Sequence, residues 1–134
     1  MRTEHESTGT IFTIPVKSKD KWWLFARVDP GIVHFYSWLA KTNGWNIIPG
    51  SRYGFHISVV LGEKPKNISI WNSLNKQAYK YKYSIKTETN YKYAWLRVQS
   101  KCFEQIRLSL GLKPTPYIPF HLTLGRFHHV KSVQ

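Results

Sequence analysis

Two related stretches stand out in this chain: Pro119-Phe-His-Leu-Thr-Leu-Gly-Arg-Phe127 and, earlier, Gly54-Phe-His-Ile-Ser-Val-Val-Leu-Gly62. Each is a short apolar run that is interrupted by one His and, two residues later, by one hydroxyl residue. Side chains alternate between the two faces of a β-strand, so the His and the hydroxyl share one face and the apolar residues occupy the other. If both strands line one cleft, the chain presents two imidazoles and two hydroxyls to a common space.

The bare pattern His-x-Ser/Thr is a weak signal. Six His and 20 Ser or Thr among 134 residues give about one match by chance, and there are three. His5-Glu-Ser7 lies in a polar terminus and is interpreted as the accidental match. The other two lie within apolar strands that run into a Gly. The alternative interpretation is that both of these His residues are half-buried and structural.

The pattern outside the two His strands predicts an α+β fold in one domain, residues 1–134. Strands are expected at residues 10–16, 22–28, 79–85 and 93–98, and helices at residues 31–41 and 100–110. Residues 1–9 are polar and are expected to form a flexible terminus. In each half, a strand leads into a helix and then through a Pro-bearing loop into a His strand. This order predicts two pseudo-symmetric lobes of antiparallel sheet with outer helices and a central cleft.

Two segments are less clear. Residues 68–75 are compatible with a short strand or a helical turn. Residues 79–83 alternate Tyr with Lys, which indicates an edge strand on which Lys prevents aggregation, with a track for bases and phosphates as the alternative. Residues 45–53 are expected to form a loop.

The chain is strongly basic. It carries 20 Lys and Arg against seven Asp and Glu, a formal net charge of +13 with His neutral. A field of this size attracts polyanions, which indicates a nucleotide, a nucleic acid or another phosphate compound as the partner. A basic surface that serves solubility or binds an acidic protein is the alternative. Six Trp and 42% hydrophobic residues indicate a folded globular protein.

Several classes of protein are not expected. Cys102 is the one cysteine, so no intramolecular disulfide can form. Arg2, Glu4 and Glu6 occupy the place of the apolar core of a signal peptide, and the apolar stretches are far shorter than the roughly 20 residues that cross a bilayer. We therefore expect a cytoplasmic location and no membrane association.

No metal and no cofactor are expected either. The candidate metal ligands are His121, His128 and His129, but no Cys pair or carboxylate accompanies them in the sequence. A glycine-rich phosphate-binding loop is also missing, which argues against an NTPase or a dinucleotide-dependent enzyme.

The two motifs resemble those of the 2H phosphoesterase superfamily, the LigT-like enzymes with two His-x-Thr/Ser motifs. Residues 119–127 are similar to the second family motif, which often reads His-x-Thr-Leu followed by a small residue and Arg. Residues 56–58 are similar to the first motif, with Ser in place of Thr. The resemblance follows the order of elements over residues 22–127, but it is specific only at the motifs. The catalytic residues that it implies are His56, Ser58, His121 and Thr123.

These residue types suit the cleavage of a phosphodiester. One group must take a proton from the attacking oxygen and another must give one to the departing oxygen, and His titrates near neutral pH. We favour His56 as base and His121 as acid. Ser58 and Thr123 can donate hydrogen bonds to the non-bridging oxygens as charge builds on them. The scheme requires no metal.

Substrate binding is expected to use charge and stacking. Arg126 matches a common position of the family and contributes charge if the end of its strand turns into the cleft; a surface salt bridge is the alternative. Stacking on an aromatic ring tolerates any base. The candidates for stacking a nucleobase are Tyr53, Trp22, Trp23 and Tyr36.

The resemblance implies several substrates. Members of the family include 2',3'-cyclic phosphodiesterases, RNA-end-processing enzymes, 2-5A phosphodiesterases and phage proteins that degrade the cyclic-oligonucleotide signals of CBASS immunity. Small size, basicity and abundant aromatic residues favour the last type, which acts on cyclic di- or trinucleotides in the host cytoplasm. The alternatives are the other family activities and, outside them, a basic RNA- or DNA-binding module in which both His residues are structural.

Overall fold

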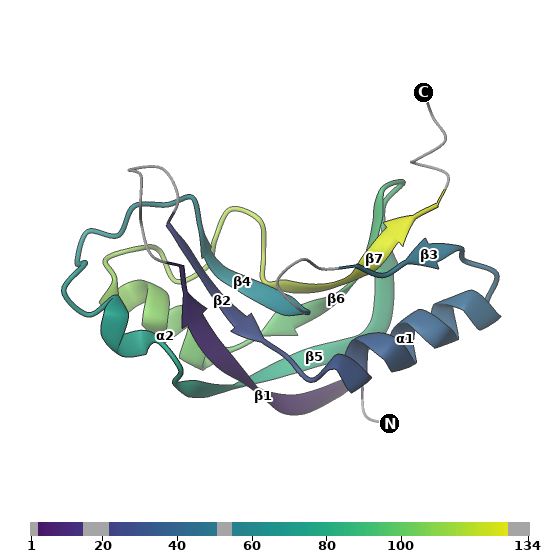
Figure 1. The fold of residues 1–134 in the computed structure, drawn as a ribbon, viewed down its shortest axis with the longest axis horizontal. Helices are drawn as coiled ribbons and strands as arrows, with labels where there is room; N and C mark the ends of the chain where they lie inside the picture. The colour runs from purple at the N-terminus through teal and green to yellow at the C-terminus, as the bar shows by residue number, and fades with distance from the viewer. Residues whose placement is uncertain (1–2, 15–21, 51–54, 129–134) are drawn as a thin grey trace.

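A computed structural model describes residues 3–14, 22–50 and 55–128 of the chain (Figure 1). In chain order its elements are β1 (Glu4–Thr13), β2 (Trp23–Arg27), α1 (Pro30–Thr42), β3 (Ile47–Ile48), β4 (His56–Leu61), the 3-10 turn η1 (Asn72–Leu74), β5 (Ala78–Thr89), β6 (Tyr93–Gln99), α2 (Lys101–Ser109) and β7 (His121–Phe127). The α+β class expected from the sequence is confirmed. Neither helix of the described part is long and apolar enough to span a membrane.

The strands form one continuous sheet in the order β3-β7-β6-β5-β1-β2-β4, and every neighbouring pair is antiparallel. Strands β4, β2 and β1 come from the first half of the chain, and β5, β6 and β7 come from the second. The pairing of β1 with β5 joins the two halves in the middle of the sheet. The sheets that the sequence predicts for two lobes are therefore continuous with each other.

Two expectations for this central pair need correction. Strand β1 begins at Glu4, inside the segment expected to be a flexible terminus, because residues 4–10 pair with residues 78–84 of β5. Strand β5 lies in the middle of the sheet and is not an edge strand. Tyr81 is buried on its core side, whereas Lys80 and Lys82 are exposed on the other face.

Both helices expected from the sequence are present, and each begins at a side-chain cap. Asp29 Oδ1 accepts a hydrogen bond from the backbone N–H of Gly31 at 2.9 Å, and Pro30 occupies the first turn. Ser100 Oγ accepts from the N–H of Phe103 at 3.1 Å and donates to the carbonyl of Lys80 at 2.7 Å. The cap of α2 therefore also ties this helix to β5.

A single hydrophobic core lies between the helices and one face of the sheet. Val33, Tyr36 and Ala40 of α1 and Phe103 and Ile106 of α2 contribute to it. The strands contribute their inward-facing apolar residues: Ile11, Leu24, Ala26, Ile57, Tyr81, Leu96, Val98, Leu122 and Leu124. Burial of these apolar side chains is the main stabilising contribution, and it leaves the other face of the sheet for polar residues.

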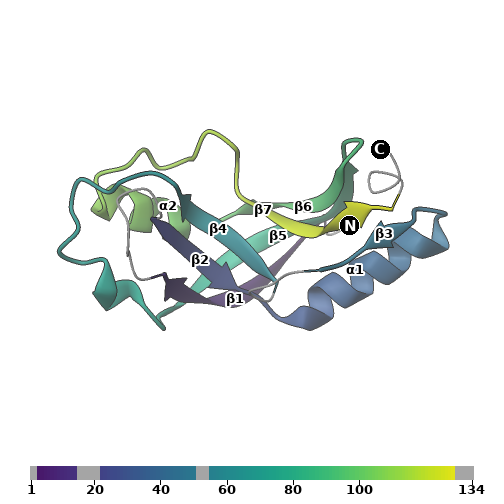
Figure 2. The same ribbon diagram turned by 45° about the horizontal axis from the view of Figure 1, so that its top comes forward.

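The sheet curls so that β4 contacts β7, although β6, β5, β1 and β2 separate them in the strand order. Figures 1 and 2 both show the first residues of β4 beside the first part of β7. The two strands that carry the His-x-Ser/Thr motifs are therefore spatial neighbours.

Strand β3 is a two-residue strand in the segment expected to be a loop, and it pairs with the end of β7. Gly125 allows this approach. A Cβ atom on Gly125 would lie 2.5 Å from Ile47 Cγ2 and 2.7 Å from the carbonyl oxygen of Ile48. The second of these atoms belongs to the backbone, so β3 itself would have to move.

Gly125→Ala is therefore expected to lower the free energy of unfolding by about 1–3 kcal/mol through overpacking. Urea denaturation followed by Trp fluorescence measures the change. Gly50→Ala is the matched control, because a Cβ atom on Gly50 meets nothing within 4 Å. Equal unfolding midpoints for the two variants would contradict this account of β3.

Candidate active site

The first motif occupies the start of β4. In the ladder with β2, His56 is the partner of Arg27 and Ser58 is the partner of Phe25. The ring of His56 lies 5.4 Å from that of Phe25 and 5.2 Å from that of Trp23, both in edge-on geometry. Trp23 Nε1 donates to Ser58 Oγ at 3.0 Å. A hydroxyl that accepts this bond keeps its own hydrogen to donate elsewhere.

The second motif occupies the start of β7. In the ladder with β6, His121 is the partner of Arg97 and Thr123 is the partner of Trp95. His121 Nδ1 lies 2.9 Å from the carbonyl oxygen of Pro119. A carbonyl can only accept, so Nδ1 carries the hydrogen. In the neutral ring Nε2 is then the basic nitrogen, and in the charged ring it is a proton donor.

Both motifs lie on the same face of the sheet, because partner residues in an antiparallel ladder point to the same side. Residues two apart on one strand also share a face. From His56, the shared face passes through its partner Arg27 to Thr10 of β1, then from Thr8 to Lys80 of β5. From Lys82 it passes to Gln99 of β6, and from Arg97 to its partner His121. This is the face opposite the helices and the core.

The surroundings of the two motifs match position by position. Residues 25–28 read Phe-Ala-Arg-Val and residues 95–98 read Trp-Leu-Arg-Val. The N–H of Val28 donates to the carbonyl of Phe55 at 3.0 Å, and the N–H of Val98 donates to the carbonyl of Phe120 at 3.1 Å. These acceptors directly precede His56 and His121. Sequence reasoning missed this repeat, and the recurring aromatic-apolar-Arg-Val pattern, 70 residues apart, could have revealed it.

A groove of about 1390 Å³ runs over β5, β6 and β7 and extends past the edge of this face to the start of α2 and the segment before β7. His121 and Thr123 line it, together with the aromatic side chains of Trp95 and Tyr93. Its cationic side chains are Lys80, Lys82, Arg97 and Lys101, and its carboxylates are Glu6, Glu88 and Glu104. His56 and Ser58 are not among the described residues that line this groove. The expected central cleft is thus seen here only on the side of the second motif.

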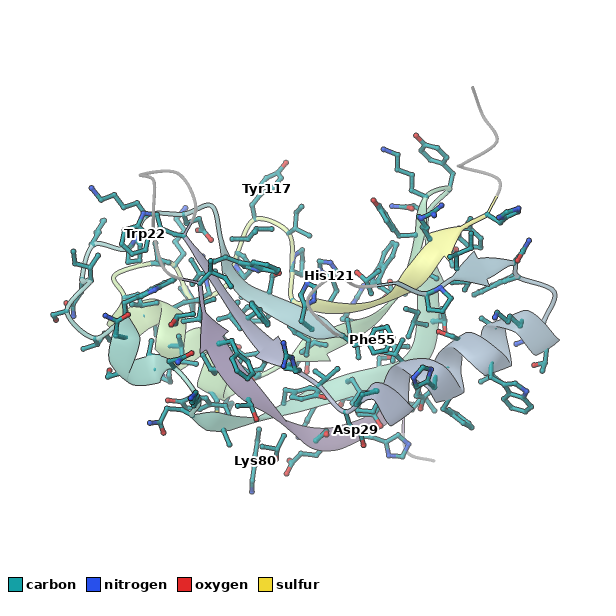
Figure 3. The ribbon with its side chains drawn as sticks, in the orientation of Figure 1. Trp22, Asp29, Phe55, Lys80, Tyr117 and His121 are labelled. Carbon is teal, nitrogen blue, oxygen red and sulfur yellow. The ribbon has the colours of Figure 1, made fainter. Side chains whose placement is uncertain are left out.

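The middle of the molecule contains the starts of both His strands. Figure 3 labels His121 and Phe55 there, whereas Tyr117 and Lys80 point outward at opposite margins of the view.

Arg97 lines the groove as the cross-strand partner of His121, and its Nη2 lies 3.0 Å from Glu88 Oε1.

The aromatic residues expected to stack a base lie in different parts of the structure. Trp23 contacts the first motif, as described above, and acts on Ser58 through its N–H. Tyr36 is buried in the core on α1, so its selection as a substrate-binding residue is wrong; burial, followed by the nearby Tyr83, raises the pKa of its phenol. Trp22 packs edge-on against Trp71 at 5.1 Å on the core side. Tyr53 lies outside the described residues.

Arg126 shares the face of His121 because β7 contains a β-bulge. Trp95 pairs with Thr123 and Ala94 pairs with Gly125, so Leu124 has no partner in the ladder. Without this extra residue, simple alternation would place Arg126 on the core side. Arg126 is half-buried and lies beside the groove, without being among its lining residues.

The buried guanidinium of Arg107 lies on the core side of β4. Arg107 of α2 is 1% exposed and makes a bidentate ion pair with Glu63, at 2.7 and 2.8 Å. The hydrogen bonds from Arg107, together with its positive charge, hold the pKa of Glu63 below its ordinary value of 4.5, against the opposing effect of burial. This pair ties α2 to the segment that follows β4.

Comparisons of the chain with protein-family models, with curated proteins and with solved structures gave no match. Among the described residues, no group of three or more His, Cys, Asp or Glu side chains is placed to hold a metal ion.

The Glu63–Arg107 pair gives a prediction about acid. Because the pKa of Glu63 is lowered by folding, its contribution to stability is complete above pH 4.5 and is lost as the pH falls through the lowered pKa. Glu63→Gln is therefore expected to lower the free energy of unfolding near pH 7 and to approach the wild type at pH 3. Urea denaturation at both pH values measures this. A difference between the proteins that grows toward low pH would contradict the assignment.

Proposed function

We propose that this chain is a metal-independent phosphodiesterase of the two-histidine type, in which His56 and His121 act as acid and base on a nucleotide phosphodiester. One observation carries the proposal: two equivalent His-x-Ser/Thr units lie on the same face of one sheet, at the starts of two strands that contact each other. A structural role for two His residues does not require that equivalence of register, partners and flanking hydrogen bonds.

The proposed arrangement is a pair of pseudo-symmetric lobes. Apart from the two-residue strand β3 in the first half, each half has the order strand, strand, helix, His strand, and the sheet order β4-β2-β1 is mirrored by β7-β6-β5. A pseudo-two-fold axis would then pass between β1 and β5. This axis relates Arg27 to Arg97 and His56 to His121, which supports a reaction centre between β4 and β7.

In the proposed reaction, one imidazole takes the proton of the attacking oxygen while the other protonates the departing oxygen. In RNA or a cyclic oligonucleotide, the attacking group is the 2'-hydroxyl, the bond from phosphorus to the 5'-oxygen breaks, and a 2',3'-cyclic phosphate forms. In a 2',3'-cyclic phosphate, water attacks and one ring P–O bond opens. We assign the base to His56. His121 is assigned as the acid, and its Nε2–H is the proton donor in this role, because the carbonyl of Pro119 holds Nδ1–H.

The hydroxyls of Ser58 and Thr123 have a separate task. A hydrogen bond from each to a non-bridging oxygen becomes stronger as negative charge develops there. Ser58 is prepared for this because the indole N–H of Trp23 occupies its oxygen as an acceptor.

The groove supports a substrate larger than one nucleotide. Its volume of about 1390 Å³ exceeds that of typical small-molecule pockets, which are about 300–1,000 Å³. Trp95, next to Thr123, can stack a base that neighbours the reacting phosphate, and Arg97 can contact a phosphate oxygen. We favour cyclic di- or trinucleotides over 2',3'-cyclic nucleotides and RNA ends as substrates.

His56→Ala and His121→Ala are each expected to lower hydrolysis by about 10²–10⁴-fold, the usual contribution of a positioned acid or base. The assay uses cyclic dinucleotides, cyclic trinucleotides and 2',3'-cyclic nucleotides, each in the presence of EDTA.

His5→Ala is the matched control, because His5 belongs to the accidental His-x-Ser match and is exposed on β1. Wild-type activity in His56→Ala or His121→Ala, or activity that disappears in EDTA, would refute the mechanism. Salt-dependent binding of RNA or DNA without turnover would instead favour the nucleic-acid-binding module.

The rate should depend on pH in a bell-shaped manner, because one imidazole must be neutral and the other charged at the start of the reaction. The measurement is kcat/KM between pH 5 and 9 for the best substrate. A flat profile over this range is not compatible with paired acid and base roles.

A further inference from the structure

Each His strand contains a β-bulge at the same place. In β7, Leu124 is the extra residue, as described above. In β4, Ser58 pairs with Phe25 and Val60 pairs with Leu24, so Val59 is the extra residue. Val59 and Leu124 directly follow the hydroxyl residue of their motif. The backbone geometry of each bulge therefore sets the direction of the His–hydroxyl pair that precedes it.

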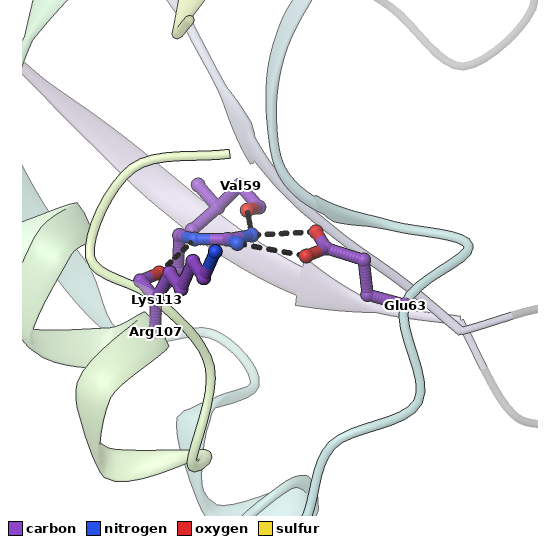
Figure 4. Close-up of polar contacts among 4 residues, drawn as sticks. All are labelled: Val59, Glu63, Arg107 and Lys113. Carbon is purple, nitrogen blue, oxygen red and sulfur yellow. Dashed lines mark hydrogen bonds and ion pairs between the residues drawn. The ribbon is translucent and has the colours of Figure 1, made fainter. Parts of the chain in front are cut away.

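The carbonyls of both bulge residues accept hydrogen bonds from buried side chains. Ser37 Oγ of α1 lies 3.4 Å from the carbonyl oxygen of Leu124. Arg107 Nη1 of α2 donates to the carbonyl oxygen of Val59 at 2.9 Å (Figure 4). An extra residue in a bulge lacks its regular ladder partner, and a buried carbonyl without a donor would cost roughly 1–3 kcal/mol.

Each of these two hydrogen bonds joins a helix of one half of the chain to the bulge of the other half, and in this sense the two bonds are crossed. Helix α1 belongs to the first half and holds the bulge of β7, whereas α2 belongs to the second half and holds the bulge of β4. Ser37 stands nine residues after Val28, and Arg107 stands nine residues after Val98. The two donors therefore occupy equivalent positions in the repeat.

Burial supports a specific role for the two donors. Of the described residues, the buried polar or charged ones are Ser37, Ser100 and Arg107, and Ser100 is explained as the cap of α2. Burial of a polar side chain costs free energy unless the side chain makes a hydrogen bond. The partner of Ser37 is the bulge carbonyl. Arg107 satisfies the bulge carbonyl, the carbonyl of Lys113 at 2.7 Å, and Glu63.

We propose that Ser37 and Arg107 are positioning residues that act across the halves: Ser37 fixes His121 and Thr123 through the bulge of β7, and Arg107 fixes His56 and Ser58 through the bulge of β4. Their catalytic importance rests on the proposed function, but the crossed positioning does not. The bond from Arg107 is shorter and comes from a charged donor, so it holds its bulge more firmly.

The test compares Ser37→Ala with Arg107→Lys. Lysine keeps the positive charge near Glu63 but lacks the planar fork that reaches two acceptors in fixed directions. Imidazole ¹⁵N chemical shifts, which report the tautomer of each ring, and the backbone amide shifts of both bulges are recorded by NMR. We expect Ser37→Ala to change the resonances of His121 and Thr123 and to leave those of His56 and Ser58 in place, and Arg107→Lys to do the reverse.

Two matched controls have a hydroxyl that donates within its own helix. Thr42 Oγ1 of α1 donates to the carbonyl of Leu39 at 2.7 Å, and Ser109 Oγ of α2 donates to the carbonyl of Ile106 at 2.7 Å. Thr42→Ala and Ser109→Ala are expected to leave both imidazoles unchanged. Unchanged imidazoles in Ser37→Ala and Arg107→Lys, or changes in the motif of the same half, would overturn the proposal.

A kinetic measurement then separates this proposal from the proposed function. If the wild type hydrolyses a cyclic nucleotide, Arg107→Lys should lower kcat roughly 10–100-fold with little change in KM, because a small displacement of the acid–base pair affects the chemical step most. A raised KM with unchanged kcat would contradict a positioning role. If no substrate is hydrolysed, the proposed function fails, and the crossed NMR pattern still decides the positioning.

Discussion

The antiparallel register between β1 and β5 is the constraint on which the rest of the arrangement depends. It joins the two halves of the chain and determines which face of each half continues into the other. A slip of one residue would turn one half over and would place the two His motifs on opposite faces of the sheet. Tyr81 opposes this slip because its side chain is buried on the core face, where Lys80 or Lys82 would be strongly unfavourable. Burial of Tyr81 thus determines which face of the sheet both imidazoles occupy.

Because of the two bulges, the short strands β4 and β7 each contribute residues both to the buried core and to the polar face of the sheet. Val59 and Val60 are both buried, as are Leu124 and Gly125, which regular alternation does not allow. The bulge turns the strand after the hydroxyl, so that the His–hydroxyl pair faces outward and two successive residues face inward. Its carbonyl then needs a donor from the core side. Both helices pack on that side, and the buried polar side chains of the described residues, apart from the cap of α2, lie on α1 and α2.

The local pattern predicted most of the elements, because alternation and helix caps are properties of neighbouring residues. It predicted β2, β6, both helices and both His strands to within a few residues. It missed the start of β1, since residues 4–8 contain no apolar residue and are ordered by a ladder with a segment more than 70 residues away. Long-range pairing also makes β5 a central strand. Arg126 could not be assigned to a face, because a bulge cannot be seen in alternation. Tyr36 was misplaced because it lies on the buried face of α1, with Val33 and Ala40, whereas Phe35 and Trp38 of the same helix are exposed.

Charge acts at two levels in this protein. The whole chain carries +13, yet the described residues that line the groove include four cationic side chains and three carboxylates, a local balance of +1. Most Lys and Arg side chains of the described residues therefore lie outside the groove, and in the proposed function they would attract a polyanion from a distance. Within the groove, Arg97 lies beside His121 and forms an exposed ion pair with Glu88, 3.0 Å from Nη2 to Oε1. If the chain binds a nucleotide substrate as proposed, a substitution of an outer Lys would act on the long-range attraction, whereas a substitution of Arg97 would act on the contacts beside His121.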